Sequence, residues 1–256
     1  MFNLPADLRF PRRALAALTL ALVAGCTTPD SPLPPGQVFD PYEAGNRKTH
    51  AFNRKLDKAL LKPASEGYAG AIPVDIRTAI GRFAENLSMP QAIVNGVLQG
   101  NMKGATEDTY RFLVNTTVGL GGFFDPATEM GMPSGTGTDF GETLDVWGVP
   151  QGAYLELPVL GPSTERAATG RIVDLFTDPL GYALPRPERY YSTGVSVLDG
   201  IGKRGRYAET INSILYESAD SYAASRSVYL QNRGFRLGRG TEEDYVDPYD
   251  MQFSDP

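Results

Sequence analysis

Acidic side chains are the first candidates for chemistry in this 256-residue chain, which carries 30 Asp and Glu residues. Glu142 stands shortly before Trp147, the single tryptophan. A carboxyl group beside an aromatic ring can have a raised pKa and act as a general acid. Glu142 also falls in the first turn of a helix predicted over 139–147, where the helix dipole favours a carboxylate. We therefore assign Glu142 no catalytic role and keep a hydrolase as the alternative interpretation.

Other catalytic and cofactor sites find little support in the sequence. The one histidine, His50, lies among charged and polar residues of a predicted helix, and we interpret it as an exposed surface residue. The segment Gly119–Phe124 does not complete a dinucleotide-binding G-x-G-x-x-G, because Phe124 occupies the third glycine position, and no G-x-S-x-G elbow is present. A single cysteine, Cys26, excludes a disulfide framework and a thiolate metal site. We predict no enzyme, no catalytic residue, no metal and no cofactor.

The N-terminus has the features of an export signal. Three arginines within residues 9–13 precede an apolar run from Ala14 to Gly25, which is too short to span a bilayer as a helix. The ending Val23-Ala24-Gly25-Cys26 resembles a bacterial lipobox, so residues 1–25 are predicted to be a signal peptide and Cys26 a lipidated N-terminus. Thr27, and not aspartate, follows the cysteine, which favours an outer-membrane lipoprotein anchored on the periplasmic face.

Charge and length limit what the mature chain can do. Without residues 1–25 it has 21 basic and 29 acidic residues, a net charge of −8, which disfavours a nucleic-acid partner. About 230 residues suffice for one folded domain. We predict a lipidated, proline-rich tether over 26–39, a helical domain over 40–236 and an acidic tail over 237–256 that is expected to be disordered.

Helical spacing of apolar residues dominates the predicted domain, which is expected to be mostly α. Prolines punctuate the pattern: Pro63 is predicted to stop the first helix, which starts near Asp40, and Pro90 to open a separate one. Further helices are expected over 106–118, 139–147, 163–176, 195–215 and 219–231. The convincing extended piece is 153–162, where Pro158 indicates an edge strand or an irregular ribbon.

The segment RFLVNTTVGLGGFFDPA, residues 111–127, begins as an amphipathic helix and ends in glycine and phenylalanine. Glycine costs a helix about 1 kcal/mol relative to alanine, so three glycines in four residues predict a helix end or a close backbone approach. In a lipid-anchored protein the same residues could instead form part of an interfacial helical surface. Both interpretations remain open from the residues alone.

Four blocks of this sequence resemble the MlaA/VacJ family of outer-membrane lipoproteins. In chain order they are 40–57, 111–127, 139–164 and 218–233. The resemblance implies a ring of short amphipathic helices with Gly and Pro breaks, embedded in one leaflet around an amphipathic channel. It implies removal of phospholipids from the outer leaflet and their transfer to a soluble periplasmic carrier, which maintains outer-membrane lipid asymmetry. An outer-membrane porin trimer is the other implied partner.

The resemblance also suggests residues on the lipid path. These candidates are Phe52, Asn53, Gly119, Gly121, Gly122, Phe123, Phe124 and Trp147. Two positions depart from the family pattern, Gly45 and Arg54, and they predict that a helix hairpin near Phe52-Asn53 is seated less deeply in lipid. The alternatives are a periplasmic lipoprotein enzyme that cleaves peptidoglycan or lipid, and a purely structural outer-membrane lipoprotein.

Overall fold

The computed structural model of the protein describes residues 27–29, 31, 38–185 and 189–239. The chain divides into two compact units, of which the first ends at Ala208 and the second begins at Glu209. The predicted signal peptide, the predicted lipidation site Cys26 and residues 240–256 of the predicted tail lie outside the described residues.

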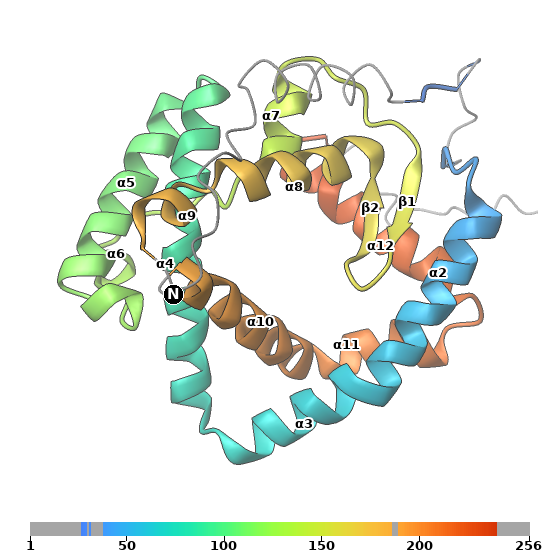
Figure 1. Cartoon of the computed structure of the whole chain (residues 1–256), viewed down its shortest axis with the longest axis horizontal. Coiled ribbons are helices and arrows are strands. Elements are labelled where there is room, and N and C mark those ends of the chain that lie inside the picture. The colour runs from blue at the N-terminus through green and yellow to red at the C-terminus, as the bar shows by residue number, and fades with distance from the viewer. Residues whose placement is uncertain (1–26, 30, 32–37, 186–188, 240–256) are drawn as a thin grey trace, which may run out of the picture. The chain divides into compact units, whose positions relative to one another are not determined.

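One long helical run opens the first unit. Helix α2 (Glu43–Leu56), the π-helical turn η1 (Asp57–Leu61) and helix α3 (Lys62–Ala71) follow one another without a break (Figure 1). The prediction that Pro63 stops this helix is wrong, and no hairpin forms near Phe52-Asn53. Pro63 stands at the start of α3, directly after the wider π turn, where the missing N–H and the ring of a proline are tolerated.

A helical hairpin of α4 (Val74–Leu98) and α5 (Met102–Thr117) comes next. The Oδ1 atom of the N-cap residue Asn101 accepts a hydrogen bond from the Gly104 N–H at 3.0 Å. The helices approach closely at Gly96, where a Cβ atom would lie 3.2 Å from the Cβ of Ala105. Pro90 lies inside α4 and does not open a separate helix, so that prediction is wrong. Packing against α5 offsets the backbone hydrogen bond that the proline removes.

The chain then passes through η2 (Leu120–Gly122) and α6 (Pro126–Glu129) to α7 (Phe140–Val146), the helix predicted over 139–147, whose N-cap is Asp139. The predicted extended segment is an antiparallel hairpin of β1 (Tyr154–Leu157) and β2 (Gly161–Thr164), with Leu157 opposite Gly161 and Pro158 in the turn. Helix α8 (Glu165–Thr177) is capped by Thr164, one residue after the predicted Ser163. Helices α9 (Pro179–Ala183) and α10 (Arg189–Arg206) complete the unit.

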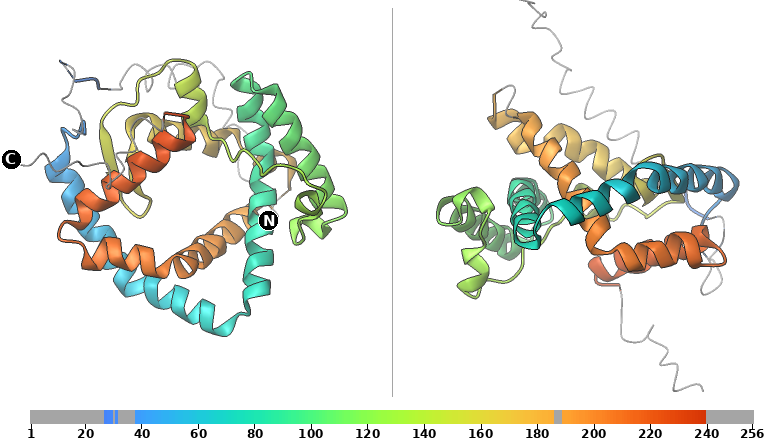
Figure 2. Two further views of the ribbon diagram at one scale, coloured as in Figure 1. Left: turned by 180° about the vertical axis from the view of Figure 1, so that it is seen from behind. Right: turned by 90° about the horizontal axis from the view of Figure 1, so that it is seen from below.

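Contacts between these elements close the first unit on itself. Helix α2 packs against β1, the β hairpin against α8, α8 against α7, and α7 against α4, while α10 packs against both α3 and α4 (Figures 1 and 2). The α7–α8 contact depends on a glycine, because a Cβ atom on Gly170 would lie 2.2 Å from the Gly141 nitrogen. A buried ion pair joins α10 to the helical run, with Arg204 Nη2 3.0 Å from Asp57 Oδ2. Within this unit the predicted ring of short helices is therefore confirmed.

The second unit contains α11 (Ala208–Asn212), which begins one residue before it, the π turn η3 (Ser213–Glu217) and α12 (Ser221–Arg236). Asp220 caps α12 by accepting hydrogen bonds from the N–H groups of Tyr222 and Ala223. The helix predicted over 195–215 is interrupted at Tyr207, between α10 and α11. Within the described ranges, no helix combines the length and apolar character that a bilayer crossing requires.

Candidate functional site

The glycine segment forms a tight turn directly after α5. Three consecutive residues, Leu120, Gly121 and Gly122, have φ angles of 52°, 78° and 102°. Gly122 also lies against α4, because a Cβ atom there would be 2.4 Å from the Cβ of Asn86. Asn86 Nδ2 donates hydrogen bonds to the Gly121 carbonyl at 3.0 Å and to Thr116 Oγ1 at 2.9 Å. The turn therefore requires glycine both for its backbone angles and for its contact with α4.

The same turn presents apolar side chains at the surface. Phe123 stacks on Phe83 of α4 with ring centroids 4.6 Å apart and still exposes 40% of its surface. Leu120 is 67% exposed and Phe124 is 57% exposed. Leu120 holds a positive φ, which costs a residue with a Cβ about 1–2 kcal/mol. The fold thus keeps a strained, exposed leucine beside two phenylalanines.

Polar side chains of α5 hold the loop that follows the turn. Arg111 Nη2 donates to both carboxylate oxygens of Asp125, at 2.9 and 3.0 Å, and Asn115 Nδ2 donates to Asp125 Oδ1 at 3.0 Å. Burial raises the pKa of Asp125, but hydrogen bonds from Thr128 and Asn115 and the charge of Arg111 outweigh it and lower the pKa below its ordinary value. Asp125 therefore stays ionised and fixes the loop to the helix.

A second polar network joins α2 to the β hairpin. Asn46 Nδ2 donates to the Tyr154 carbonyl at 3.0 Å, and Asn46 Oδ1 accepts from the Glu156 N–H at 3.0 Å. Asn53 makes the same two kinds of bond three residues further along the hairpin. Its Nδ2 donates to the Leu157 carbonyl at 2.9 Å, and its Oδ1 accepts from the Val159 N–H at 2.8 Å. The two asparagines, seven residues apart, thus take the place of a third strand along the free edge of β1.

His50 lies between these asparagines and is buried, so the prediction of an exposed histidine is wrong. Its Nδ1 atom is 3.4 Å from Glu156 Oε1, and Glu156 Oε2 accepts a hydrogen bond from the Tyr154 hydroxyl at 2.6 Å. The charged neighbours of His50 in the sequence suggested exposure, whereas its contact Glu156 lies more than 100 positions away in the chain. The i, i+4, i+7 spacing of residues 46, 50 and 53 was the available signal for a common helix face.

The residues predicted for the lipid path fall in three places. Phe52 and Asn53 lie on α2, where Phe52 is half exposed and Asn53 is held by the β hairpin. The five predicted residues between positions 119 and 124 lie in the turn after α5. Trp147 is the C-cap of α7, where its Nε1 donates to the Leu98 carbonyl at 3.1 Å and its ring meets Phe140 edge-on.

Glu142 lies in the first turn of α7 as predicted, and its carboxylate is buried. The Thr138 hydroxyl donates to Glu142 Oε2 at 2.7 Å, and the Asp139 cap is one turn away. Nearby, Asp174 accepts hydrogen bonds from Gln91, Asn95 and the Phe140 N–H. Burial raises the pKa of Asp174 above its ordinary value despite these bonds. This network joins α4, α7 and α8, and it was not predicted from the sequence.

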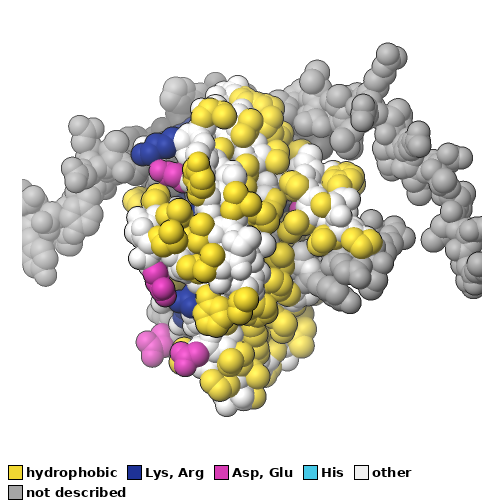
Figure 3. Space-filling view, turned by 90° about the vertical axis from the view of Figure 1, so that its left-hand side faces the viewer, with side chains coloured by type: hydrophobic (Ala, Val, Ile, Leu, Met, Phe, Trp, Pro, Cys, Tyr) yellow, Lys and Arg dark blue, Asp and Glu magenta, His cyan; other side chains and the backbone are white. Residues whose placement is uncertain are grey.

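The distribution of polar and apolar side chains in the first unit is the reverse of that in a soluble protein. Apart from alanines, its buried hydrophobic residues among those described are Met89, Phe140, Leu144 and Tyr154. Large hydrophobic side chains lie instead on the surface, and they include Phe52, Leu60, Ile76, Val97, Leu113, Val118, Leu120, Phe124, Leu175 and Phe176. Hydrophobic atoms spread over the side that carries α5 and α6, with charged groups gathered toward one edge (Figure 3).

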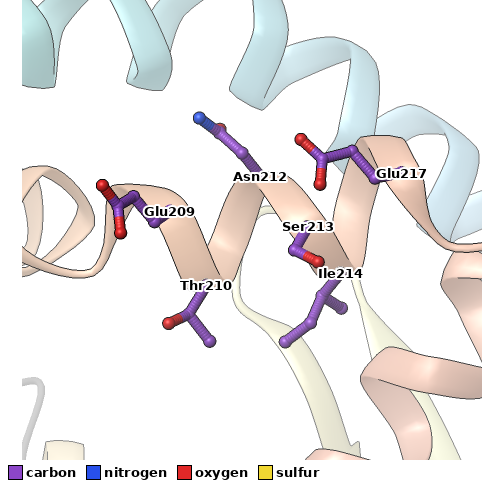
Figure 4. Close-up of a pocket in the computed structure, with 6 residues that line it drawn as sticks. All are labelled: Glu209, Thr210, Asn212, Ser213, Ile214 and Glu217. Carbon is purple, nitrogen blue, oxygen red and sulfur yellow. The ribbon is translucent and has the colours of Figure 1, made fainter.

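The second unit has a hollow of its own. The hollow beside α11 and η3, about 560 Å³ in volume, is lined by residues of that one helical segment. Asn212 projects to the opposite side of the segment from Thr210 and Ile214, so these residues do not converge on a common point (Figure 4). The described residues include no group of His, Cys, Asp and Glu side chains arranged to hold a metal ion.

Comparison with known proteins places this geometry in a family. Residues 38–236 match the family model of the MlaA lipoprotein. The chain belongs to the MlaA lipoprotein family. The intermembrane phospholipid transport system lipoproteins MlaA of Escherichia coli and Haemophilus influenzae are 32% and 31% identical to it, over 90% and 88% of this chain and 90% of each relative.

Two further comparisons agree with this membership. An uncharacterised protein of Rickettsia felis is 36% identical over 77% of each chain. A solved structure is similar to this chain with a TM-score of 0.68 and 30% sequence identity, over 77% of this chain and 98% of that one. It is described as the structural basis for maintenance of bacterial outer membrane lipid asymmetry. The MlaA family is thus a family of lipoproteins, and this member has the mostly helical fold of its solved relative.

Proposed function

We propose that this MlaA family lipoprotein lies in the inner leaflet of the outer membrane and removes phospholipids from the outer leaflet. The observation that carries the proposal is the reversed arrangement of the first unit, with hydrogen-bonded charged groups inside and large hydrophobic side chains outside. Exposing such a surface to water costs about 25 cal/mol of free energy for each Å² of apolar area, and contact with lipid acyl chains avoids this cost. Buried polar groups that are paired within the protein, such as Arg111 with Asp125, suit a surrounding without water.

The transfer needs a path and no catalyst. A phospholipid that leaves a bilayer loses about 0.8 kcal/mol for each methylene exposed to water, so a continuous apolar surface lowers the barrier. We propose that Phe52, Phe123, Phe124 and Trp147 contribute to this path from three separate points of the first unit, with Gly119, Gly121 and Gly122 shaping the wall at the turn. Asn53 holds the β hairpin beside it. A soluble periplasmic carrier would receive the lipid, and an outer-membrane porin trimer would hold the protein in place.

Anchoring is proposed to involve Cys26 together with the helical domain. Thr27, the residue after it, donates from its N–H to Glu165 Oε2 at 2.6 Å, so the tether begins beside the start of α8. One acyl chain binds membranes only marginally, and the apolar helices would supply the remaining affinity. Changing Cys26 to Ala should leave an unacylated protein, which intact mass spectrometry detects. An unmodified mature N-terminus at another residue would contradict this assignment.

The test of the function is the lipid content of the protein and of the cell. Protein purified in detergent should carry phospholipid, measured by mass spectrometry of its extract. Cells that lack it should accumulate phospholipid in the outer leaflet, and the Glu142→Gln variant should restore them, since Glu142 is assigned a structural role. Absence of bound lipid would contradict transport. Loss of function in Glu142→Gln, with the protein folded and membrane-bound, would favour the hydrolase.

A further inference from the structure

A charged cleft lies between α4 and α10 in the first unit. Its volume is about 440 Å³, within the range of small-molecule sites. Five ionisable side chains line it: Arg82 and Glu85 from α4, and Asp199, Lys203 and Arg206 from α10. Gly81 lets the two helices approach, because a Cβ atom there would lie 3.3 Å from Asp199 Oδ1 and 3.8 Å from Arg206 Nη2.

The pairing of these charges is incomplete. Lys203 and Asp199 form an ion pair at 2.7 Å within α10. Among the described residues, the side chains of Arg82, Glu85 and Arg206 have no hydrogen-bond or ion-pair partner, although all three border the cleft. Two unpaired guanidinium groups and one unpaired carboxylate therefore face a cavity in a chain whose formal net charge is −6. The cleft is locally positive on an acidic protein.

This set of charges matches one class of ligand. A guanidinium group binds phosphate oxygens through two parallel N–H donors, so Arg82 and Arg206 suit a phosphodiester. A carboxylate beside them would repel a simple anion but would attract an ammonium group. We propose that the cleft binds the headgroup of an amine-bearing phospholipid, with its phosphate at Arg82 and Arg206 and its ammonium group at Glu85. This inference rests on the proposed lipid transport and adds headgroup selectivity to it.

The carboxylate of Glu85 distinguishes between candidate ligands of the cleft. Free phosphate would use the two arginines but would leave Glu85 without a partner. The same argument disfavours an acidic protein segment.

The experiment uses the full-length protein in detergent, incubated with equal amounts of phosphatidylethanolamine and phosphatidylglycerol, and quantifies bound lipid by mass spectrometry. The double variant Arg82→Gln/Arg206→Gln should retain about tenfold less phosphatidylethanolamine, as expected from the loss of charge-assisted hydrogen bonds. Glu85→Gln should lower the ratio of bound phosphatidylethanolamine to phosphatidylglycerol. Lys48→Gln/Arg171→Gln is the matched control, because both side chains are exposed and neither has a partner among the described residues.

The outcomes separate the inference from the function on which it rests. Wild-type protein that retains no phospholipid overturns the proposed transport and the inference with it. Wild-type retention that the double variant reproduces, with both proteins equally folded by circular dichroism, overturns the headgroup site alone. Release of bound lipid by inorganic phosphate at an equal concentration shows a free-phosphate site and also overturns it. Selective loss of phosphatidylethanolamine in the cleft variants, and not in the control, supports it.

Discussion

Gly121 and Gly122 are neighbours in sequence and both have positive φ angles, yet the structure predicts very different costs for replacing them by alanine. A Cβ atom on Gly121 would meet only the Phe83 ring, at an ordinary contact distance of 3.8 Å. A Cβ atom on Gly122 would lie 2.4 Å from the Cβ and 2.7 Å from the Cγ of Asn86. Asn86 is buried in α4, so it cannot turn away without losing its hydrogen bonds to the turn.

The magnitudes follow from these contacts. Alanine at a left-handed φ costs about 1–2 kcal/mol, and this is the whole expected loss for Gly121→Ala. Gly122→Ala adds an overlap with a packed helix, about 1–3 kcal/mol, and about 1 kcal/mol for each Asn86 hydrogen bond that breaks. The free energy of unfolding should therefore fall by about 3–7 kcal/mol for Gly122→Ala. At about 2–4 °C per kcal/mol for a protein of this size, the two midpoints should differ by at least about 4 °C.

Thermal unfolding of both variants in the same detergent, followed by circular dichroism at the helix band, measures this difference. Gly131→Ala is a second control, because its φ is 78° and its Cβ would meet no atom within 4 Å. Gly122→Ala should also leave more phospholipid in the outer leaflet of complemented cells. Equal midpoints for Gly121→Ala and Gly122→Ala would refute the assigned contact between the turn and α4.

Three further predictions follow from the other contacts. Asn46→Ala should destabilise the protein by about 2–4 kcal/mol in chemical unfolding, because it leaves the Tyr154 carbonyl and the Glu156 N–H unpaired; an effect below about 1 kcal/mol would contradict the strand-like role. Val159→Asn should stabilise the hairpin by up to about 1 kcal/mol, since Val159 has a φ of 69° and asparagine tolerates that region, and a lower midpoint would count against it. The pKa of Asp125 is lowered in the folded protein, so the stability that Asp125 contributes is complete above pH 3.8 and is lost as the pH falls through the folded pKa. The pKa of Asp174 is raised, so the stability that Asp174 contributes is lost as the pH rises from 3.8 through the folded pKa. Unfolding titrations of Asp125→Asn and Asp174→Asn should each lose the corresponding slope.

Local patterns in the sequence were sufficient for much of the fold. Apolar residues at helical spacing predicted mostly α structure, and Phe140, Leu144 and Trp147 predicted the short helix α7. The cluster of glycines after Thr117 predicted the end of α5, because glycine disfavours a helix interior and favours positive φ angles. Pro158 likewise predicted that the extended segment would be an edge strand or an irregular ribbon and not a central strand, and the structure has this proline in the turn of a two-stranded hairpin. Each of these features depends on residues a few positions apart.

Proline misled the same reasoning twice. Pro63 and Pro90 each remove one backbone donor, which locally favours a helix break. In the structure, a π turn precedes Pro63 and packing against α5 supports α4 around Pro90, so both helices continue. The cost of a proline is local, whereas the contacts that offset it come from other parts of the chain.

Burial of charged and polar residues was decided by the tertiary structure alone. His50 is surrounded by polar neighbours in sequence, but Glu156 and Tyr154 cover it from the hairpin. The cleft beside Arg82 exists because α10 returns to α4 more than 100 residues later. In a soluble protein, polarity predicts exposure because water solvates charges. In the first unit, paired polar groups lie inside and many large apolar side chains face outward. The polarity of a residue therefore does not predict its burial here, and only the tertiary contacts show which side chains are buried.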